Sequence, residues 1–191
     1  MGKIALILAP GVVSPAEALA RACGLTAVSV GDLFREHVHR RTAAGLRFQR
    51  YIRDERPVPA QMVEDIVEEA LAGAPGGWVL SGFPRTISQA EMLTRIGCEP
   101  DSVIELALAE EQISQDWRLA RERETIASLQ ASYHEAAGPL RARYLAAGVY
   151  RAGTGTGIAG YEQMASQLIA LVLNGQESAW PSRFPAEPGR G

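Results

Sequence analysis

The chain has 191 residues, of which 47% are hydrophobic, with a net charge of −3 and an isoelectric point near 5.7. This length predicts one domain with a sizeable core, and the acidic balance argues against bulk binding to nucleic acid or anionic membranes. No apolar run reaches the roughly 18 residues of a membrane span. The first residues lack the charged and apolar regions of a signal peptide. We therefore expect a cytoplasmic protein.

The two cysteines, Cys23 and Cys98, stand apart in apolar surroundings. Their spacing matches neither a metal site nor a redox pair, which predicts two reduced, buried thiols. We expect no metal ion and no cofactor. Lys3 is the only lysine, and all other basic residues except the histidines are arginines.

The predicted elements alternate between strand and helix from the N-terminus. Lys3–Leu8 is short and apolar, which indicates a buried strand. The stretch Ser14-Pro15-Ala16-Glu17 reads as a capping box with proline at the first helical position, so a helix is expected over 15–22. A strand at 27–30 and helices over 32–42 and 45–54 follow.

After an extended Pro57-Val58-Pro59, residues 60–72 form a predicted amphipathic helix, with Met62, Ile66, Val67 and Leu71 on one face. Gly76-Gly77 closes a turn. The later elements are strand 78–80, helix 88–96, strand 102–108, a long helix over 110–145 interrupted near Gly138-Pro139, strand 149–151 and helix 161–173. Residues 174–191 read as a tail rich in Pro, Gly and Ser. The alternation predicts an α/β fold with a parallel sheet and helices on both faces.

The most informative motifs lie between residues 29 and 144. "SVGDLFR" starts at Ser29, "SGFPRTISQAEML" starts at Ser81, and "ET" at 124–125 precedes "YHEAAGPLRARY". These motifs resemble the adenylate kinase (nucleoside monophosphate kinase) family, which reads S-T-G-D-[LM]-[LI]-R and D-G-F-P-R-T-x-x-Q-A-x-x-L. The resemblance covers most of residues 3–173. It implies a three-layer parallel sheet of the P-loop nucleoside monophosphate kinase type, with a small helical monophosphate-binding insertion at 31–72 and a minimal lid.

The resemblance also implies an acceptor site for a nucleoside monophosphate such as AMP. The matching arginines of the family, here Arg35 and Arg85, hold the AMP phosphate, as planar guanidinium donors can. The matching glutamine, Gln89, reads the adenine edge, and the backbone of Val58 borders the adenine. Gly82 permits close backbone approach. Taken singly, Arg35 could be a surface helix residue and Arg85 a helix cap.

The segment after the first strand departs from the family. Adenylate kinases carry G-x-P-G-x-G-K-G-T there, whereas this chain reads Pro10-Gly11 and then "VVSP", without a lysine. Lys3 lies at the far end of the strand. The valines resist a left-handed backbone, and Pro15 removes an N–H from the helix N-terminus. We expect a degenerate phosphate loop rebuilt as a plain helix start, and ATP is not an expected ligand.

Other departures agree. Ser81 replaces the aspartate that helps to organise Mg²⁺ in the family, Leu129 replaces a catalytic arginine, and the lid is nearly deleted. Val30 replaces a threonine of the monophosphate site and cannot donate a hydrogen bond. Arg118 matches the first lid-flanking arginine, with Arg121 and Arg123 close by in the sequence; they are either remnants of a phosphate clamp or a solvated face.

Three hypotheses stay open. The chain is a degenerate member that binds a monophosphate without kinase activity, or an enzyme with changed, ATP-independent chemistry on a nucleotide, or a non-enzymatic module with a vestigial site and a protein partner. The candidate groups for changed chemistry are Asp32, Ser81, His37, His39 and His134. The structural alternative is that His37 and His39 lie on an exposed helix and that His134 belongs to helix packing.

Overall fold

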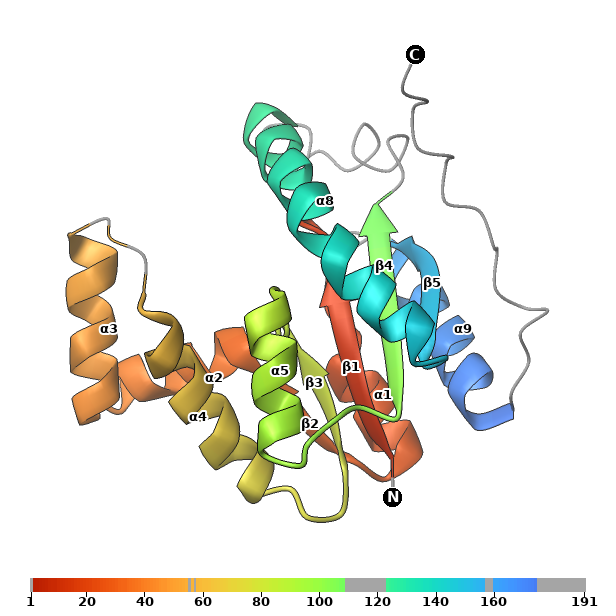
Figure 1. Ribbon diagram of the computed structural model, residues 1–191, viewed down its shortest axis with the longest axis horizontal. Coiled ribbons are helices and arrows are strands. Elements are labelled where there is room, and N and C mark those ends of the chain that lie inside the picture. Colours follow the sequence, from red (N-terminus) through yellow and green to blue (C-terminus); the bar gives the residue numbers. More distant parts are fainter. Residues whose placement is uncertain (1, 55, 57, 109–122, 157–159, 175–191) are drawn as a thin grey trace.

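Five parallel strands form one sheet in the order β2-β3-β1-β4-β5 (Figure 1). The computed structural model describes residues 2–54, 56, 58–108, 123–156 and 160–174. The strands are β1 (Lys3–Leu8), β2 (Thr26–Ser29), β3 (Trp78–Ser81), β4 (Ser102–Leu108) and β5 (Tyr150–Gly155). The helices of the described residues are α1 (Ala16–Cys23), α2 (Val30–His39), α3 (Ala43–Arg53), α4 (Ala60–Ala72), α5 (Ile87–Arg95), α8 (Arg123–Ala146) and α9 (Tyr161–Asn174).

Helices cover both faces of the sheet, and each face has its own core. Alternate residues of β1 point to opposite faces. Ala5 and Ile7 belong to the core under α4, α5 and α8, whereas Ile4 and Leu6 belong to the core under α1 and α9. Full burial of a leucine such as Leu6 contributes about 1.5–3 kcal/mol. The predicted three-layer α/β architecture is therefore confirmed.

The strand order places a crossover beside β1. β1 pairs with β3 on one side, where Leu6 faces Ser81, and with β4 on the other, where Leu6 faces Ile104. All five strands run in the same direction, so their carboxyl ends share one edge of the sheet. Ligands of open parallel sheets bind outside this edge, near the point where the strand order reverses.

Residues 31–72 contain α2, α3 and α4, and α3 lies at the end of the molecule away from the sheet (Figure 1). α2 and α3 pack closely, because a Cβ on Gly45 would lie 2.0 Å from the carbonyl oxygen of His37. The ring centroids of Phe34 and Phe48 are 4.3 Å apart, and Phe48 is fully buried. α3 therefore turns its Gly45–Phe48 side toward α2 and presents the opposite side outward.

α4 begins and ends where the hydrophobic pattern predicts, but its buried face differs. Ile66, Val67 and Leu71 are buried as expected, whereas Met62 is half-buried and Glu64 is buried instead. The Glu64 carboxylate lies 3.5 Å from the Arg95 guanidinium, which offsets part of the cost of burying it.

The predicted capping box at Ser14 is wrong. α1 begins at Ala16, so Pro15 occupies the cap position and supplies no side-chain acceptor. The Ser14 Oγ accepts a hydrogen bond from the Ala16 N–H at 3.3 Å rather than from Glu17. Glu17 still lies in the first turn of the helix.

α2 and α5 begin earlier than predicted because a hydroxyl caps each. Ser29 Oγ accepts from the Asp32 N–H, and Thr86 Oγ1 accepts from the Gln89 N–H, each at 3.3 Å. Such caps satisfy donors that have no partner within the helix. The strand expected at 27–30 consequently ends at Ser29.

The predicted interruption near Gly138-Pro139 is also wrong, since α8 continues through Pro139. Ala137, Leu140 and Tyr144 of this helix are buried. Their packing against the sheet outweighs the backbone hydrogen bond that proline cannot make. The part of the predicted helix over 110–122 lies outside the described residues.

β5 extends to Gly155, beyond the predicted strand 149–151. Ala152 to Gly155 pair with Glu105 to Leu108 of β4. A Cβ on Gly155 would lie 2.6 Å from Val12 Cγ2, so glycine is needed where β5 passes the loop after β1.

Cys23 and Cys98 are both free, as predicted, although each is half-buried rather than buried. Burial raises the pKa of the Cys23 thiol. α9 includes Asn174, and the predicted tail beyond it lies outside the described residues. Across the residues that the structure describes, the helices are too short or too polar to cross a membrane.

Candidate functional site

The candidate monophosphate site lies at the carboxyl ends of β2 and β3. Ser29 and Ser81 are the last residues of these strands and face each other in register. The chain continues from Ser29 into α2, which carries Asp32 and Arg35, and from Ser81 through Gly82 to Arg85 and α5. Two neighbouring parallel strands thus deliver both candidate arginines to the same edge of the sheet.

Arg35 forms an ion pair with Asp32, one helical turn earlier. Its guanidinium covers Gly31, where an added Cβ would lie 3.4 Å from Arg35 Nη1. Hydrogen bonds from Ser29 and then from Arg35 hold the pKa of Asp32 below its usual value. Both side chains are well exposed, so an anion can reach the guanidinium from solvent.

Arg85 is held by the loop that presents it. Its Nε donates to the Gly82 carbonyl at 3.2 Å, and its backbone N–H donates to Gln89 Oε1 at 2.6 Å. Gly82 has φ +81°, a left-handed conformation that favours glycine. Because Gln89 accepts through its oxygen, its amide nitrogen keeps two donors for another group.

The two guanidinium groups approach one small region of backbone. A Cβ built on Gly82 would lie 3.6 Å from Val30 Cβ and 3.9 Å from Arg85 Nη2, and Val30 precedes Gly31 beneath Arg35. Two planar cations beside a backbone without bulky side chains can hold a phosphate group by charge-assisted, two-point hydrogen bonds. Val30 is itself buried and offers no polar atom.

The structure also shows where Val58, Ser81 and Lys3 lie. Val58 is half-buried in the connection before α4. Ser81 is buried at the end of β3. Lys3 is at the opposite edge of the sheet, where its Nζ donates to the Gly97 carbonyl at 2.9 Å. The single lysine therefore points away from this site, as predicted.

Two backbone donors of the loop between β1 and α1 already bond to carbonyl groups of the protein. The Val12 N–H donates to the Ala9 carbonyl at 3.1 Å, and the Val13 N–H donates to the Thr156 carbonyl at 3.0 Å. Val12 also packs on the core under α1 and α9. A phosphate-binding loop needs its N–H groups to converge on the anion, and these two donors are occupied.

The histidines were candidates for changed chemistry, and the structure gives one of them a packing role. His37 Nδ1 lies 2.8 Å from Thr42 Oγ1, and its ring meets Phe48 edge-on at 6.2 Å. His37 therefore helps to join α2 to α3. His39 is exposed at the end of α2.

Several predicted residues cannot be placed. Arg118 and Arg121 lie outside the described residues, as do the side chains of Arg123, Leu129 and His134. In the described ranges, the carboxylates, histidines and cysteines form no group of three or more that is suited to a metal ion.

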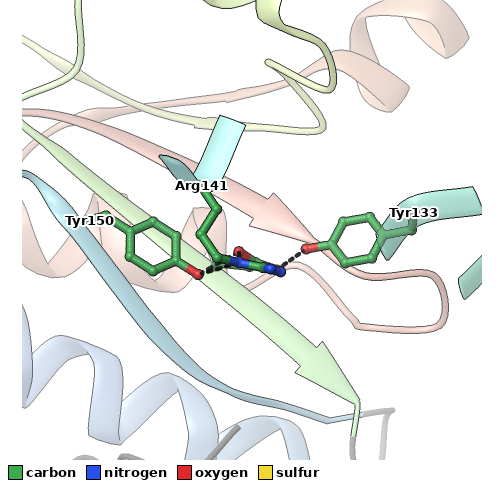
Figure 2. A network of polar contacts seen from close by, with 4 residues as sticks. Tyr133, Arg141 and Tyr150 are labelled. Carbon is green, nitrogen blue, oxygen red and sulfur yellow. Dashed lines mark hydrogen bonds and ion pairs between the residues drawn. The ribbon is translucent and has the colours of Figure 1, made fainter. Parts of the chain in front are cut away.

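Sequence reasoning missed a buried polar cluster built on Glu105 (Figure 2). Glu105 lies in β4 with no exposed surface. Arg141 of α8 donates to both of its carboxylate oxygens, at 2.7 and 3.0 Å. Tyr133 and Tyr150 donate at 2.8 and 2.5 Å. The sequence signal was a single charged residue, Glu105, inside an otherwise apolar strand.

This cluster keeps the Glu105 carboxylate charged. Burial alone would raise its pKa, but the hydrogen bonds from Arg141, Tyr150 and Tyr133 outweigh it and lower the pKa. The pKa values of Tyr133 and Tyr150 rise through burial and the nearby carboxylate. A fully hydrogen-bonded ion pair of this kind fixes α8 against β4 and β5.

The geometry can be compared with known proteins. Residues 9–149 match the family model described as adenylate kinase. The chain is 37% identical over 112 residues to an adenylate kinase of Mycolicibacterium paratuberculosis, covering 56% of this chain and 59% of that protein. It is 36% identical over 104 residues to adenylate kinase 1 of a Nostoc species, covering 51% and 56%. The matched part thus spans somewhat more than half the length of these relatives.

Proposed function

The chain belongs to the adenylate kinase family, and on this premise we propose that it binds a nucleoside monophosphate such as AMP but has lost ATP-dependent phosphoryl transfer. In this proposal residues 31–72 form the monophosphate-binding part of a domain over 1–173. The observation that carries it is a contrast between the segments that follow β2 and β3 and the loop that follows β1. The segments after β2 and β3 carry Arg35 and Arg85 at the same edge of the sheet, whereas the Val12 and Val13 N–H groups after β1 already bond to carbonyl groups of the protein.

Support for monophosphate binding comes from the charge and geometry around Gly31 and Gly82. Arg35 and Arg85 supply two permanent positive charges for a phosphate group. Gln89 is oriented by the Arg85 N–H, so its amide nitrogen is left to donate to a base. Asp32 competes with a phosphate for Arg35, and binding would exchange that exposed ion pair for a charge-assisted contact.

Support for the loss of phosphoryl transfer comes from the groups that neutralise charge. Phosphoryl transfer depends on positioning and electrostatic stabilisation rather than on covalent work by the protein. The loop after β1 has no lysine, Ser81 stands where the family has a Mg²⁺-organising aspartate, and Leu129 stands in place of an arginine. Each lost electrostatic contact costs several kcal/mol of barrier on the general scale of such groups.

Binding of AMP to single-arginine variants tests the proposal. Arg35→Ala or Arg85→Ala removes a charge-assisted contact worth about 1.5–3 kcal/mol, so each should weaken AMP binding roughly tenfold or more by calorimetry. Arg21→Ala is the control, because it makes the same charge change at an exposed position of α1, a helix without candidate site residues. ATP should show no saturable binding.

The outcomes separate the hypotheses. AMP binding that survives both single substitutions would contradict the assignment of the arginines. Absence of binding by any nucleotide would favour a vestigial site and a protein partner. Consumption of a monophosphate without ATP would favour changed chemistry in the same pocket.

A further inference from the structure

Positive charge is concentrated in one segment of this acidic chain. Residues 35–56 contain seven arginines and three acidic residues, a net charge of +4, whereas the whole chain has a net charge of −3. The segment spans the second half of α2, all of α3 and the start of the connection to α4. Part of this charge is already paired, since Arg35, Arg40 and Arg53 each contact a neighbouring carboxylate.

Three of the arginines without such a contact, Arg47, Arg50 and Arg56, line a hollow beside α3. The hollow has a volume of about 230 Å³ and is lined by Arg47, Arg50, Tyr51, Asp54 and Arg56. Arg47, Arg50 and Asp54 follow the spacing i, i+3, i+7, which places them on one face of the helix. This face is opposite the side that carries Gly45 and Phe48 and packs on α2. We call it the α3 hollow.

Among the described residues that line the α3 hollow, three arginines stand against one carboxylate, that of Asp54. Arg47 and Arg50 make no ion pair with any residue in the described ranges. The Arg56 guanidinium lies 5.5 Å from the centre of the Tyr51 ring, and its backbone N–H donates to the Tyr51 carbonyl. Asp54 is already paired with Arg53 at 3.0 Å.

Stabilisation of the helix end explains only part of this arrangement. Cations in the last turn interact favourably with the helix dipole, and Arg50 and Arg53 occupy that turn. Arg47 lies three residues before Arg50, outside the last turn, and Arg56 lies beyond the helix with its guanidinium near the Tyr51 ring. Three guanidinium groups and one carboxylate, that of Asp54, line the hollow, so positive charge remains that a bound anion would balance.

We propose that the α3 hollow binds a compact phosphate anion, of the size of a phosphate or diphosphate group. Arginine forks match phosphate oxygens in charge and geometry. A volume of about 230 Å³ falls below the ~300–1,000 Å³ of pockets that enclose a drug-sized ligand. A larger phosphorylated molecule would therefore place its phosphate in the hollow and leave its remainder in solvent.

This site is separate from the candidate monophosphate site. The α3 hollow shares no residue with the set Arg35, Val58, Gly82, Arg85 and Gln89. Its lining residues on α3 face away from α2, which carries Arg35. Binding at one site can therefore be removed by substitution without touching the other.

Calorimetric titration of the full chain with inorganic phosphate and with pyrophosphate tests the proposal. We expect saturable binding to the Arg85→Ala variant, in which the monophosphate site is weakened. Arg47→Gln or Arg50→Gln should weaken pyrophosphate binding about tenfold each, since each removes one charge-assisted contact. Arg40→Gln is the matched control, because it removes the same charge from the same basic segment outside the hollow.

Three results would overturn the proposal. These are non-saturable binding that disappears at physiological ionic strength, an equal loss in Arg40→Gln and Arg47→Gln, or binding lost in Arg85→Ala alone. Glutamine keeps a good helix propensity at these exposed positions, and circular dichroism verifies that each variant is folded. Titration with a short single-stranded RNA forms a further arm. RNA binding that depends on Arg47 while pyrophosphate fails to bind would also contradict a compact anion site.

Discussion

At the scale of single residues, Glu105 shows how this chain tolerates a charge inside its sheet. A carboxylate with no exposed surface would ordinarily be protonated or replaced. Here Arg141, Tyr133 and Tyr150 supply donors to both oxygens. Tyr144 shows the contrast, because its buried hydroxyl has no hydrogen-bond partner among the described residues and burial raises its pKa to about 12.

The lowered pKa of Glu105 predicts an acid-sensitive fold. A carboxyl whose pKa falls on folding stabilises the protein above its unfolded pKa of about 4.3. That contribution is lost as the pH falls through the lower folded value. Glu105→Gln should therefore reduce stability at pH 7 by about 3 kcal/mol, and less as the pH approaches 3. Thermal unfolding of both proteins across this pH range measures the difference.

Glu99→Gln is the control for this experiment, since Glu99 forms an exposed ion pair with Arg143 at 3.3 Å. Its effect should stay within about 1 kcal/mol throughout. A gap between wild type and Glu105→Gln that does not narrow on acidification would show that the carboxylate is not the source of the stability.

At the scale of helices and strands, the sequence predicts an element best where hydrophobic burial alone decides it. Ser102–Leu108 and Ala60–Ala72 match the predicted bounds. The full length of β5 could not be predicted, because its glycines have low strand propensity. The structure requires glycine at position 155 because β5 packs closely against Val12 there. The continuous α8 was missed for a similar reason, since burial of Leu140 and Tyr144 overrides the local effect of Pro139.

We expect the present structure of the loop after β1 to be stabilised by its own contacts. The missing lysine is then not the only reason why the loop does not bind ATP. We predict that replacing residues 12–15 by G-A-G-K-G-T will lower stability and will not restore ATP binding. The graft removes the packing of Val12 beside Gly155 and the Ser14–Ala16 hydrogen bond. It also adds glycines that raise the entropy of the unfolded chain. Together these effects should cost roughly 1–3 kcal/mol.

Thermal unfolding measures the stability of the grafted protein and of the wild type, and titration with ATP measures whether either protein binds it. ATP binding that returns with unchanged stability would mean that the remaining groups of the site are intact. In that case the losses at Ser81 and Leu129 would matter less than proposed.

At the scale of the whole molecule, the family and the three-layer architecture follow from the sequence, because the motifs around Ser29 and Ser81 lie at strand ends. These motifs also locate Arg35 and Arg85. The Glu105 cluster and the α3 hollow could not be predicted, since each depends on side chains that only the fold brings together. Sequence spacing alone does not reveal that α8 places Arg141 against β4.

The most direct measurement is the formation of ADP from ATP, AMP and Mg²⁺ by the purified full chain. Loss of the lysine, of the Mg²⁺-organising aspartate and of one arginine predicts no turnover above the blank, while AMP still binds in a parallel titration. An ordinary adenylate kinase in the same assay shows that the conditions support the reaction. ADP formation by this chain at a rate near that of the ordinary enzyme would contradict the proposed function.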